Sequence, residues 1–455
     1  MRSIHLDSRL ASTALLTCLV APLALHAQTR PAITAVGAAK ASSTDSLGSI
    51  TNIRALPGGR LLVNDASSRR VLLLDSTMKT ISVVADSTSS TANAYGPRSG
   101  ALIAYRGDST LFVDAASLSM LVIDGNGKIV RVMSVPRAQD AAMLTGGVFG
   151  GAAYDGAGHL VYRALPNMQM RMAPGAANSA GTIAAPTVPD SLAIVRVDLA
   201  SRKIDTVAFV RIPKTSTQIN RGDDGSISVN VEVNPLPIVD EWAILPDGTI
   251  GVIRGKDYHV DWITTDGART SSVKIPFDWK RLTDEQKVTF LDSVKVQRER
   301  IMAAAPPGQG GMAAIGAIMG GGGGGGGGAP NVRMEMRMGP PGAGGPPGAG
   351  APSGAMQAPK INMSYGSPSD LPDYQPPFFA NAAKADADGN IWVKTIPTKP
   401  IPGGDVYDLI NRKGEVTQRV QLPAERTLVG FGPGGTVFLS ARNGTITRLE
   451  RATWK

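Results

Sequence analysis

The sequence predicts an all-β fold, a six-bladed β-propeller with four-stranded blades. Residues 62–75 align without a gap with residues 111–124, which lie 49 positions downstream, so one structural unit is repeated. A glycine-containing turn followed by short apolar runs recurs further along the chain and gives six such units in total. The composition agrees with this fold, because 42 % hydrophobic residues can build a core and a single cysteine excludes a disulfide-based scaffold.

Each unit is predicted to contain four short strands joined by tight turns. The turns before the second strands lie at residues 57–59, 107–109, 155–158, 246–248, 388–390 and 433–435. Four antiparallel strands repeated radially form a propeller, in which each sheet buries its faces against its neighbours. A β-sandwich or a solenoid is the alternative for the same strand pattern.

The last unit is incomplete, and this bears on how the ring closes. No clear fourth strand follows Leu449. We predict that residues 32–38, close to the start of the mature chain, supply this strand, because a closed ring leaves few free sheet edges.

The first 27 residues are typical of a secretory signal peptide. Arg2 and Arg9 are positively charged, residues 10–24 are mostly apolar, and Ala27 fits a cleavage site. A lipoprotein signal that ends at Cys18 is the alternative. We therefore expect a periplasmic or secreted monomer whose propeller spans residues 28–453, with no integral membrane span after cleavage.

Two insertions are predicted to interrupt the ring. Residues 164–190 are rich in Ala, Pro, Met and Gly and are expected to form a loop, and residues 277–379 form a larger insertion. A capping box at Thr283 and Gln286, with apolar residues at helical spacing, predicts one helix over about residues 284–304. The segment of about 305–360 contains a glycine run and many prolines, so we expect it to be disordered.

The first unit resembles the NHL-type repeat. Its second strand, Leu-Leu-Val-Asn-Asp, ends at Asp65, as that repeat's second strand ends in aspartate, and Arg70 and Val71 match its Arg-Val pair. The resemblance covers residues 45–276 and 380–453, and the whole chain looks like the six-bladed propellers of secreted bacterial proteins. It implies the fold and not an activity, because units three to six depart from the repeat at the Asp65 position.

The ends of the second strands are the candidate ligand site. In a propeller these positions form a ring near one mouth of the channel, and here they are Asp65, Asp114, Arg163, Arg254, Lys394 and Ser440. The three basic residues would form an arc that can bind a carboxylate or phosphate. The alternative is that all six side chains are hydrogen-bonded in turns and between blades.

His259 is a further candidate, and no metal site or cofactor is predicted. Strand alternation places Asp257, His259 and Asp261 on one face, where a carboxylate can set the tautomer of the imidazole, although a histidine packed between blades has the same pattern. Residues 386–390 are similar to the start of a calcium loop, but no later acidic ligand follows, so a strand-connecting turn is predicted.

These features favour an exported binding module that takes a peptide, glycan or protein ligand at the channel mouth. The alternative is a channel-centred hydrolase or lyase of the gluconolactonase-like kind, which this chain resembles in blade count only. That family holds a divalent metal with Glu, Asn and Asp, and no matching trio can be placed here. Nucleic acid is not expected as a partner despite the net charge of +9, because the basic residues are scattered and the signal exports the chain.

Overall fold

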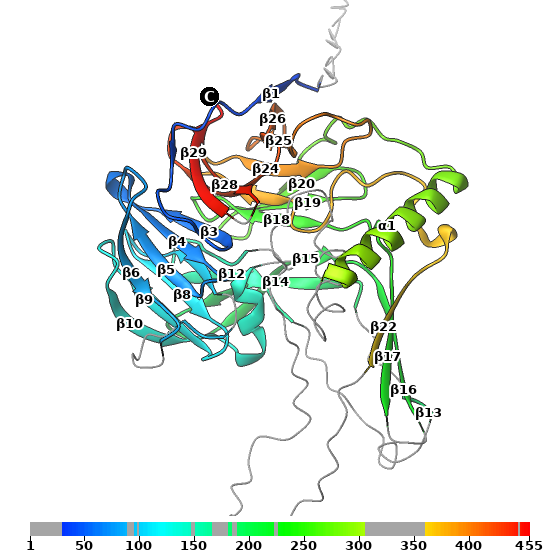
Figure 1. Ribbon diagram of the computed structural model, residues 1–455, viewed down its shortest axis with the longest axis horizontal. Helices are drawn as coiled ribbons and strands as arrows, with labels where there is room; N and C mark the ends of the chain where they lie inside the picture. Colours follow the sequence, from blue (N-terminus) through cyan, green and yellow to red (C-terminus); the bar gives the residue numbers. More distant parts are fainter. Residues whose placement is uncertain are drawn as a thin grey trace, which may run out of the picture.

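The computed structural model describes residues 30–88, 95–97, 100–146, 151–165, 181–183, 189–222, 226–304, 360–444 and 446–455. Within these ranges the strands form seven β-sheets (Figure 1). The predicted signal peptide and nearly all of the predicted disordered segment lie outside the described residues. No helix in the described ranges is long and apolar enough to cross a membrane.

Six of the sheets are blades, each with four antiparallel strands that follow one another from the inner to the outer edge. The first blade contains β3 (Ile50–Ala55), β4 (Leu61–Asp65), β5 (Arg70–Leu74) and β6 (Thr80–Ala85). The second blade contains β7 (Ala101–Ala104), β8 (Thr110–Asp114), β9 (Ser119–Ile123) and β10 (Ile129–Ser134). The third blade contains β11 (Ala153–Tyr154), β12 (His159–Arg163), β14 (Ser191–Asp198) and β15 (Ile204–Arg211).

The remaining three blades follow the same order. The fourth blade contains β18 (Glu241–Ile244), β19 (Ile250–Arg254), β20 (His259–Ile263) and β21 (Arg269–Ser271). The fifth blade contains β23 (Ala383–Ala385), β24 (Ile391–Thr395), β25 (Val406–Ile410) and β26 (Val416–Gln421). The last blade contains β27 (Arg426–Gly432), β28 (Thr436–Asn443), β29 (Ile446–Thr453) and β2 (Ala41–Ser42). Short 3-10 helices connect some of the elements, at Pro57–Gly59, Ala138–Thr145 and Pro368–Asp370.

Hydrophobic packing joins these six sheets into a closed ring. In the described part of the chain, one apolar cluster lies between each pair of successive blades, and a sixth joins the last blade to the first. Leu61 and Leu62 show how one strand serves two interfaces: Leu61 packs toward the last blade and Leu62 toward the second. Because both faces of a blade are buried at its centre, the middle strands such as β4 and β5 are mostly apolar, and the propeller prediction is confirmed.

The ring closes with a different segment from the one predicted. The fourth strand of the last blade is β2, in which Ala41 and Ser42 pair with β29. The predicted closing segment instead contributes β1 (Ile33–Ala35), which pairs in parallel with β26 as a fifth strand of the fifth blade. The prediction was therefore wrong in its residues, because two short strands form rather than one, and the second of them completes the last blade.

The seventh sheet lies outside the ring and was not predicted. It contains β13 (Gly181–Ile183), β16 (Thr215–Arg221), β17 (Ile227–Val233) and β22 (Lys360–Tyr365), and it projects from the blades in Figure 1. The expectation of a simple loop over residues 164–190 is therefore corrected, because residues 181–183 pair with β16. The predicted helix is present as α1 (Asp284–Ala304).

Side-chain-capped turns connect many of the strands within the blades. The Asp386 carboxylate accepts hydrogen bonds from the backbone N–H groups of Asp388 and Asn390, at 3.0 and 2.8 Å. Gly389 has a φ of +86°, a conformation that favours glycine. The same Asx-type turn forms at Asp75 and Asp124, so the calcium-loop-like sequence is a strand-connecting turn as predicted.

Candidate functional site

The side chains predicted to form a ring lie at corresponding ends of the blades. Four of them are the last residues of second strands: Asp65, Asp114, Arg163 and Arg254. Lys394 is the next-to-last residue of its strand, and Ser440 lies inside its strand. The prediction that these residues end the second strands is therefore correct for four of the six and wrong for Lys394 and Ser440, because β24 and β28 continue past them.

The two aspartates of the ring are used by local structure. Asp65 is fully buried, accepts hydrogen bonds from the backbone of Gly48 and Ser49 at 3.0 Å each, and pairs with Arg70 at 3.0 Å. Asp114 is also buried and accepts hydrogen bonds from the turn that follows it. These contacts account for both carboxylates without a ligand.

The three basic residues do not form a free cationic arc, because each has an acidic partner. Arg254 pairs with Asp240 at 2.9 Å and with Asp261 at 2.7 Å. Lys394 lies 3.6 Å from Asp405. The third basic residue, Arg163, faces the carboxylate of Glu241, which was not among the predicted site residues. Unlike Arg254 and Lys394, it is almost completely buried.

Arg163 and Glu241 form a buried and incompletely bonded ion pair. Arg163 ends β12 of the third blade, and Glu241 begins β18, the innermost strand of the fourth blade. Their residues are 3 % and 1 % exposed, and the closest N–O separation between the charged groups is 3.9 Å. This distance is too long for a hydrogen bond. In the described part of the chain, Nε and Nη2 of Arg163 and Oε2 of Glu241 have no hydrogen-bond partner.

Burial changes the acidity of this pair. Loss of solvent raises the pKa of Glu241 to about 7, although Arg163 and a hydrogen bond from the backbone N–H of Asn381 both favour the ionised form. Burial likewise lowers the pKa of Arg163. Glu241 can therefore exchange a proton near neutral pH, a property common among acid–base groups in active sites.

The fifth blade adds a positive charge near Arg163 and Glu241. Lys384 lies on β23, the innermost strand of the fifth blade, and burial lowers the pKa of its ammonium, as does neighbouring Lys394. Glu241 acts in the opposite direction on Lys384. We refer to Arg163, Glu241 and Lys384 as the central charge cluster. Innermost strands face the channel of a propeller, so two of the three side chains belong to strands at the channel wall.

Glu241 begins an innermost strand and so lies outside the set of second-strand ends that the repeat marks. The available signal was a pair of acids, Asp240 and Glu241, directly before the apolar residues Trp242, Ala243 and Ile244. A charge at the entrance of an otherwise apolar inner strand is costly to bury and therefore marks a position worth inspection.

His259 lies beside both predicted carboxylates. Its Nδ1 is 2.8 Å from Asp257 and its Nε2 is 3.2 Å from Asp261, which also binds Arg254. The contact with Asp257 is a hydrogen bond, whereas Nε2 is a close polar neighbour of Asp261. The imidazole thus links a surface carboxylate to the Arg254 ion pairs, and a role in holding these strands explains its position.

Neither arrangement resembles a metal centre. Among the described residues, no group of three or more His, Cys, Asp or Glu side chains could hold a metal ion. The central charge cluster is instead suited to an organic polar group, because it combines a guanidinium, an ammonium and a carboxylate of near-neutral pKa.

Comparisons with known proteins find distant structural similarity. No protein-family model and no curated relative matches the sequence. Regucalcin, a calcium-binding protein from Agrobacterium tumefaciens, has 11 % identity over 93 % of this chain and 98 % of its own, with a TM-score of 0.37. A gluconolactonase from Xanthomonas campestris has 11 % identity over 94 % and 100 %, with a TM-score of 0.38.

A virginiamycin B lyase from Staphylococcus aureus has 11 % identity over 91 % of this chain and 98 % of its own, with a TM-score of 0.37. Because these TM-scores and identities are low, the assignment of the propeller fold rests on the order and packing of the sheets described above. The activities named are those of the similar proteins. The NHL-type resemblance stays a prediction.

Proposed function

We propose that this protein binds a small polar ligand at the central charge cluster, in the channel of the propeller. The observation that carries the proposal is the set of buried, unbonded atoms on Arg163 and Glu241. Buried polar groups are nearly always hydrogen-bonded, and leaving one unbonded costs about 1–3 kcal/mol. A ligand that bonds to these atoms would recover this free energy.

The unbonded atoms define the chemistry of the ligand. Nε and Nη2 of Arg163 lie on one edge of the guanidinium and match the two oxygens of a carboxylate. Oε2 of Glu241 can accept a hydrogen bond from a neighbouring hydroxyl or amine. A compact hydroxy acid or amino acid, free or at the end of a peptide or glycan chain, has both groups. The near-complete burial of the pair favours a compact group over a bulky one.

A thermal unfolding screen tests the proposal. Hydroxy acids, amino acids and sugar acids are added to the mature protein, and a compound that binds the native state raises the melting temperature. We expect at least one such compound, and we expect Arg163→Leu to abolish its effect. Arg131→Leu is the matched control, because Arg131 is exposed on the outer strand β10. Failure of every compound, or a shift that persists in Arg163→Leu, would contradict the proposal.

The second candidate is a hydrolase or lyase reaction at the same cluster. The pKa of Glu241, raised to about 7, favours this candidate, because a general acid or base works best when its pKa is close to the working pH. A lactone is a suitable first substrate, since its opening needs proton transfer. An activity whose pH profile has an inflection near 7, lost in Glu241→Gln, would support catalysis over binding alone.

A further inference from the structure

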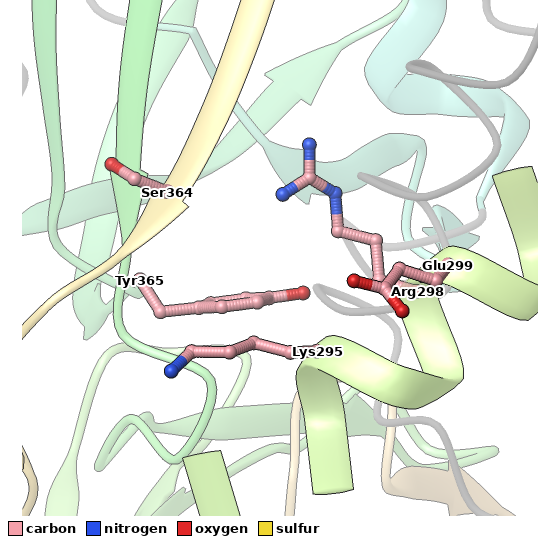
Figure 2. Close-up of a pocket in the computed structure, with 5 residues that line it drawn as sticks. All are labelled: Lys295, Arg298, Glu299, Ser364 and Tyr365. Atoms are coloured by element: carbon pink, nitrogen blue, oxygen red, sulfur yellow. The ribbon is translucent and has the colours of Figure 1, made fainter. Parts of the chain in front are cut away.

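A pocket lies outside the ring, between the helix and the seventh sheet. Helix α1 runs beside β22 in Figure 1, and the pocket between them has a volume of about 630 Å³. This is within the range of about 300–1,000 Å³ that is usual for small-molecule sites. Three side chains of α1 and two of β22 line it, and Figure 2 shows them: Lys295, Arg298, Glu299, Ser364 and Tyr365.

The helix is fixed beside the sheet by its N-terminal half. Leu291 is buried with Leu236 and Leu371 in one apolar cluster, against which Tyr365 also packs. Lys287 is nearly buried and its ammonium lies 3.0 Å from Asp373. The pocket begins in the turn after this anchored half, so one wall is held in place by a packed cluster rather than by a loop.

Arg298 supplies a positioned cation. Its Nη1 donates a 2.6 Å hydrogen bond to the backbone carbonyl of Met363, which fixes the guanidinium over β22. In the described part of the chain no carboxylate forms an ion pair with it. Lys295, by contrast, is 3.1 Å from Asp292 and therefore partly neutralised. Arg298 is thus the cation that remains available to an anion.

Tyr365 supplies a hydroxyl group at the same place. Its oxygen is buried and has no hydrogen-bond partner among the described residues. Figure 2 shows the ring lying across the pocket with the hydroxyl directed toward the helix, near Arg298 and Glu299. Burial raises the pKa of this phenol, so it keeps its proton and acts as a hydrogen-bond donor at neutral pH.

We propose that this pocket is a second binding site, which takes a small organic carboxylate with an apolar body. The carboxylate accepts hydrogen bonds from the Arg298 guanidinium and the Tyr365 hydroxyl, an arrangement of charged donor and acceptor that is stronger than a neutral pair. The apolar body lies against the Tyr365 ring and the aliphatic part of Lys295. Lys295, Arg298 and Glu299 together give the lining one net positive charge, so a monocarboxylate fits better than a dianion.

Calorimetric titration of the full mature chain with phenylacetate tests this site. Phenylacetamide, which has the same shape without the charge, is the matched ligand, and we expect it to bind at least about 5-fold more weakly. Arg298→Leu should weaken phenylacetate binding about 10-fold or more, the scale of a charged hydrogen bond. Tyr365→Phe, which keeps the packed ring, should weaken it about 2- to 5-fold.

Arg300→Leu is the control, because Arg300 is an exposed arginine on the same helix that does not line the pocket. It should change the affinity less than 2-fold. The proposal is overturned if phenylacetate does not bind at millimolar concentration, if phenylacetamide binds equally well, or if the Arg300 variant loses as much affinity as the Arg298 variant.

Discussion

Glu241 is a carboxyl group whose pKa lies well above its ordinary value. Its carboxyl group is buried beside a guanidinium that is too distant to form a hydrogen bond with it, at 3.9 Å. A buried ion pair of this geometry recovers little of the cost of desolvation. The ion pair therefore adds little to the free energy of unfolding, and this free energy depends on whether Glu241 is protonated.

The stability of the protein should depend on the protonation of Glu241. Its pKa is about 7 in the folded protein, against an ordinary value of 4.5, so the folded state binds the proton more tightly than the unfolded state. The resulting stabilisation is complete below about pH 4.5 and is lost as the pH rises through 7. Relative to wild type, Glu241→Gln should gain about 2–3 kcal/mol of unfolding free energy between pH 5 and pH 8.

Chemical denaturation of both proteins across this pH range measures the difference. A constant difference between wild type and Glu241→Gln would show that the carboxyl group titrates normally.

Arg254 is a bridge between blades. In addition to its two carboxylate partners, its Nη1 donates a hydrogen bond of 2.9 Å to the backbone carbonyl of Phe209 in the neighbouring blade. Arg254→Ala should lower the unfolding free energy by about 2–4 kcal/mol, because Asp240 and Asp261 would lose their shared cation. Arg131→Ala, on an exposed strand, should change it by less than about 0.5 kcal/mol. Equal stability of the two variants would contradict the bridging role.

The strands of the blades could be predicted from the sequence because each repeated unit is made of residues that follow one another in the chain. A glycine turn and two apolar runs identify the same unit six times, and the capping box identifies α1. The seventh sheet could not be predicted. Its strand β16 is polar except for Ile219, and β22 pairs in parallel with β17 from more than a hundred residues away. Pairing of this kind leaves no pattern in a single sequence.

The candidate site was predicted in part for the same reason. Arg163, Arg254 and Lys394 follow the repeat, so their positions on the strands could be derived from the sequence. Their partners could not. Glu241 contacts Arg163 across the interface between the third and fourth blades, and Asp240 and Asp405 lie just before strands that neighbour those of Arg254 and Lys394. Whether a cation is free or paired depends on that packing.

The N-terminal strands β1 and β2 should be required for a stable ring. They cover the outer edges of the fifth and last blades, and Arg30 just before them contacts the buried carboxylate of Asp408 at 3.3 Å. A chain that begins at Ser46 should melt at a lower temperature and aggregate, because two sheet edges are uncovered. A chain that begins at Arg30 is the control and should behave as the mature protein does. Equal melting temperatures of the two chains would contradict this role.

The whole molecule is stabilised by the interfaces between blades. Each of the clusters in the ring is built from blade strands and their connections. Deleting residues 308–358 should therefore leave the ring folded, since a change in loop length costs little closure free energy. Loss of cooperative thermal unfolding in the deletion variant would show that this segment belongs to the fold.

The central claim is that the Arg163–Glu241 pair serves ligand binding rather than stability, and one measurement tests it most directly. This is the free energy of unfolding of the double variant Arg163→Met, Glu241→Gln at pH 8. Glutamine keeps an acceptor for the Asn381 N–H, and methionine fills the space of the arginine stem without a charge. We predict a double variant as stable as wild type, or more stable by about 1–3 kcal/mol, as for other buried pairs replaced by uncharged residues. A loss of about 3 kcal/mol or more would show that the pair is structural and would contradict the account.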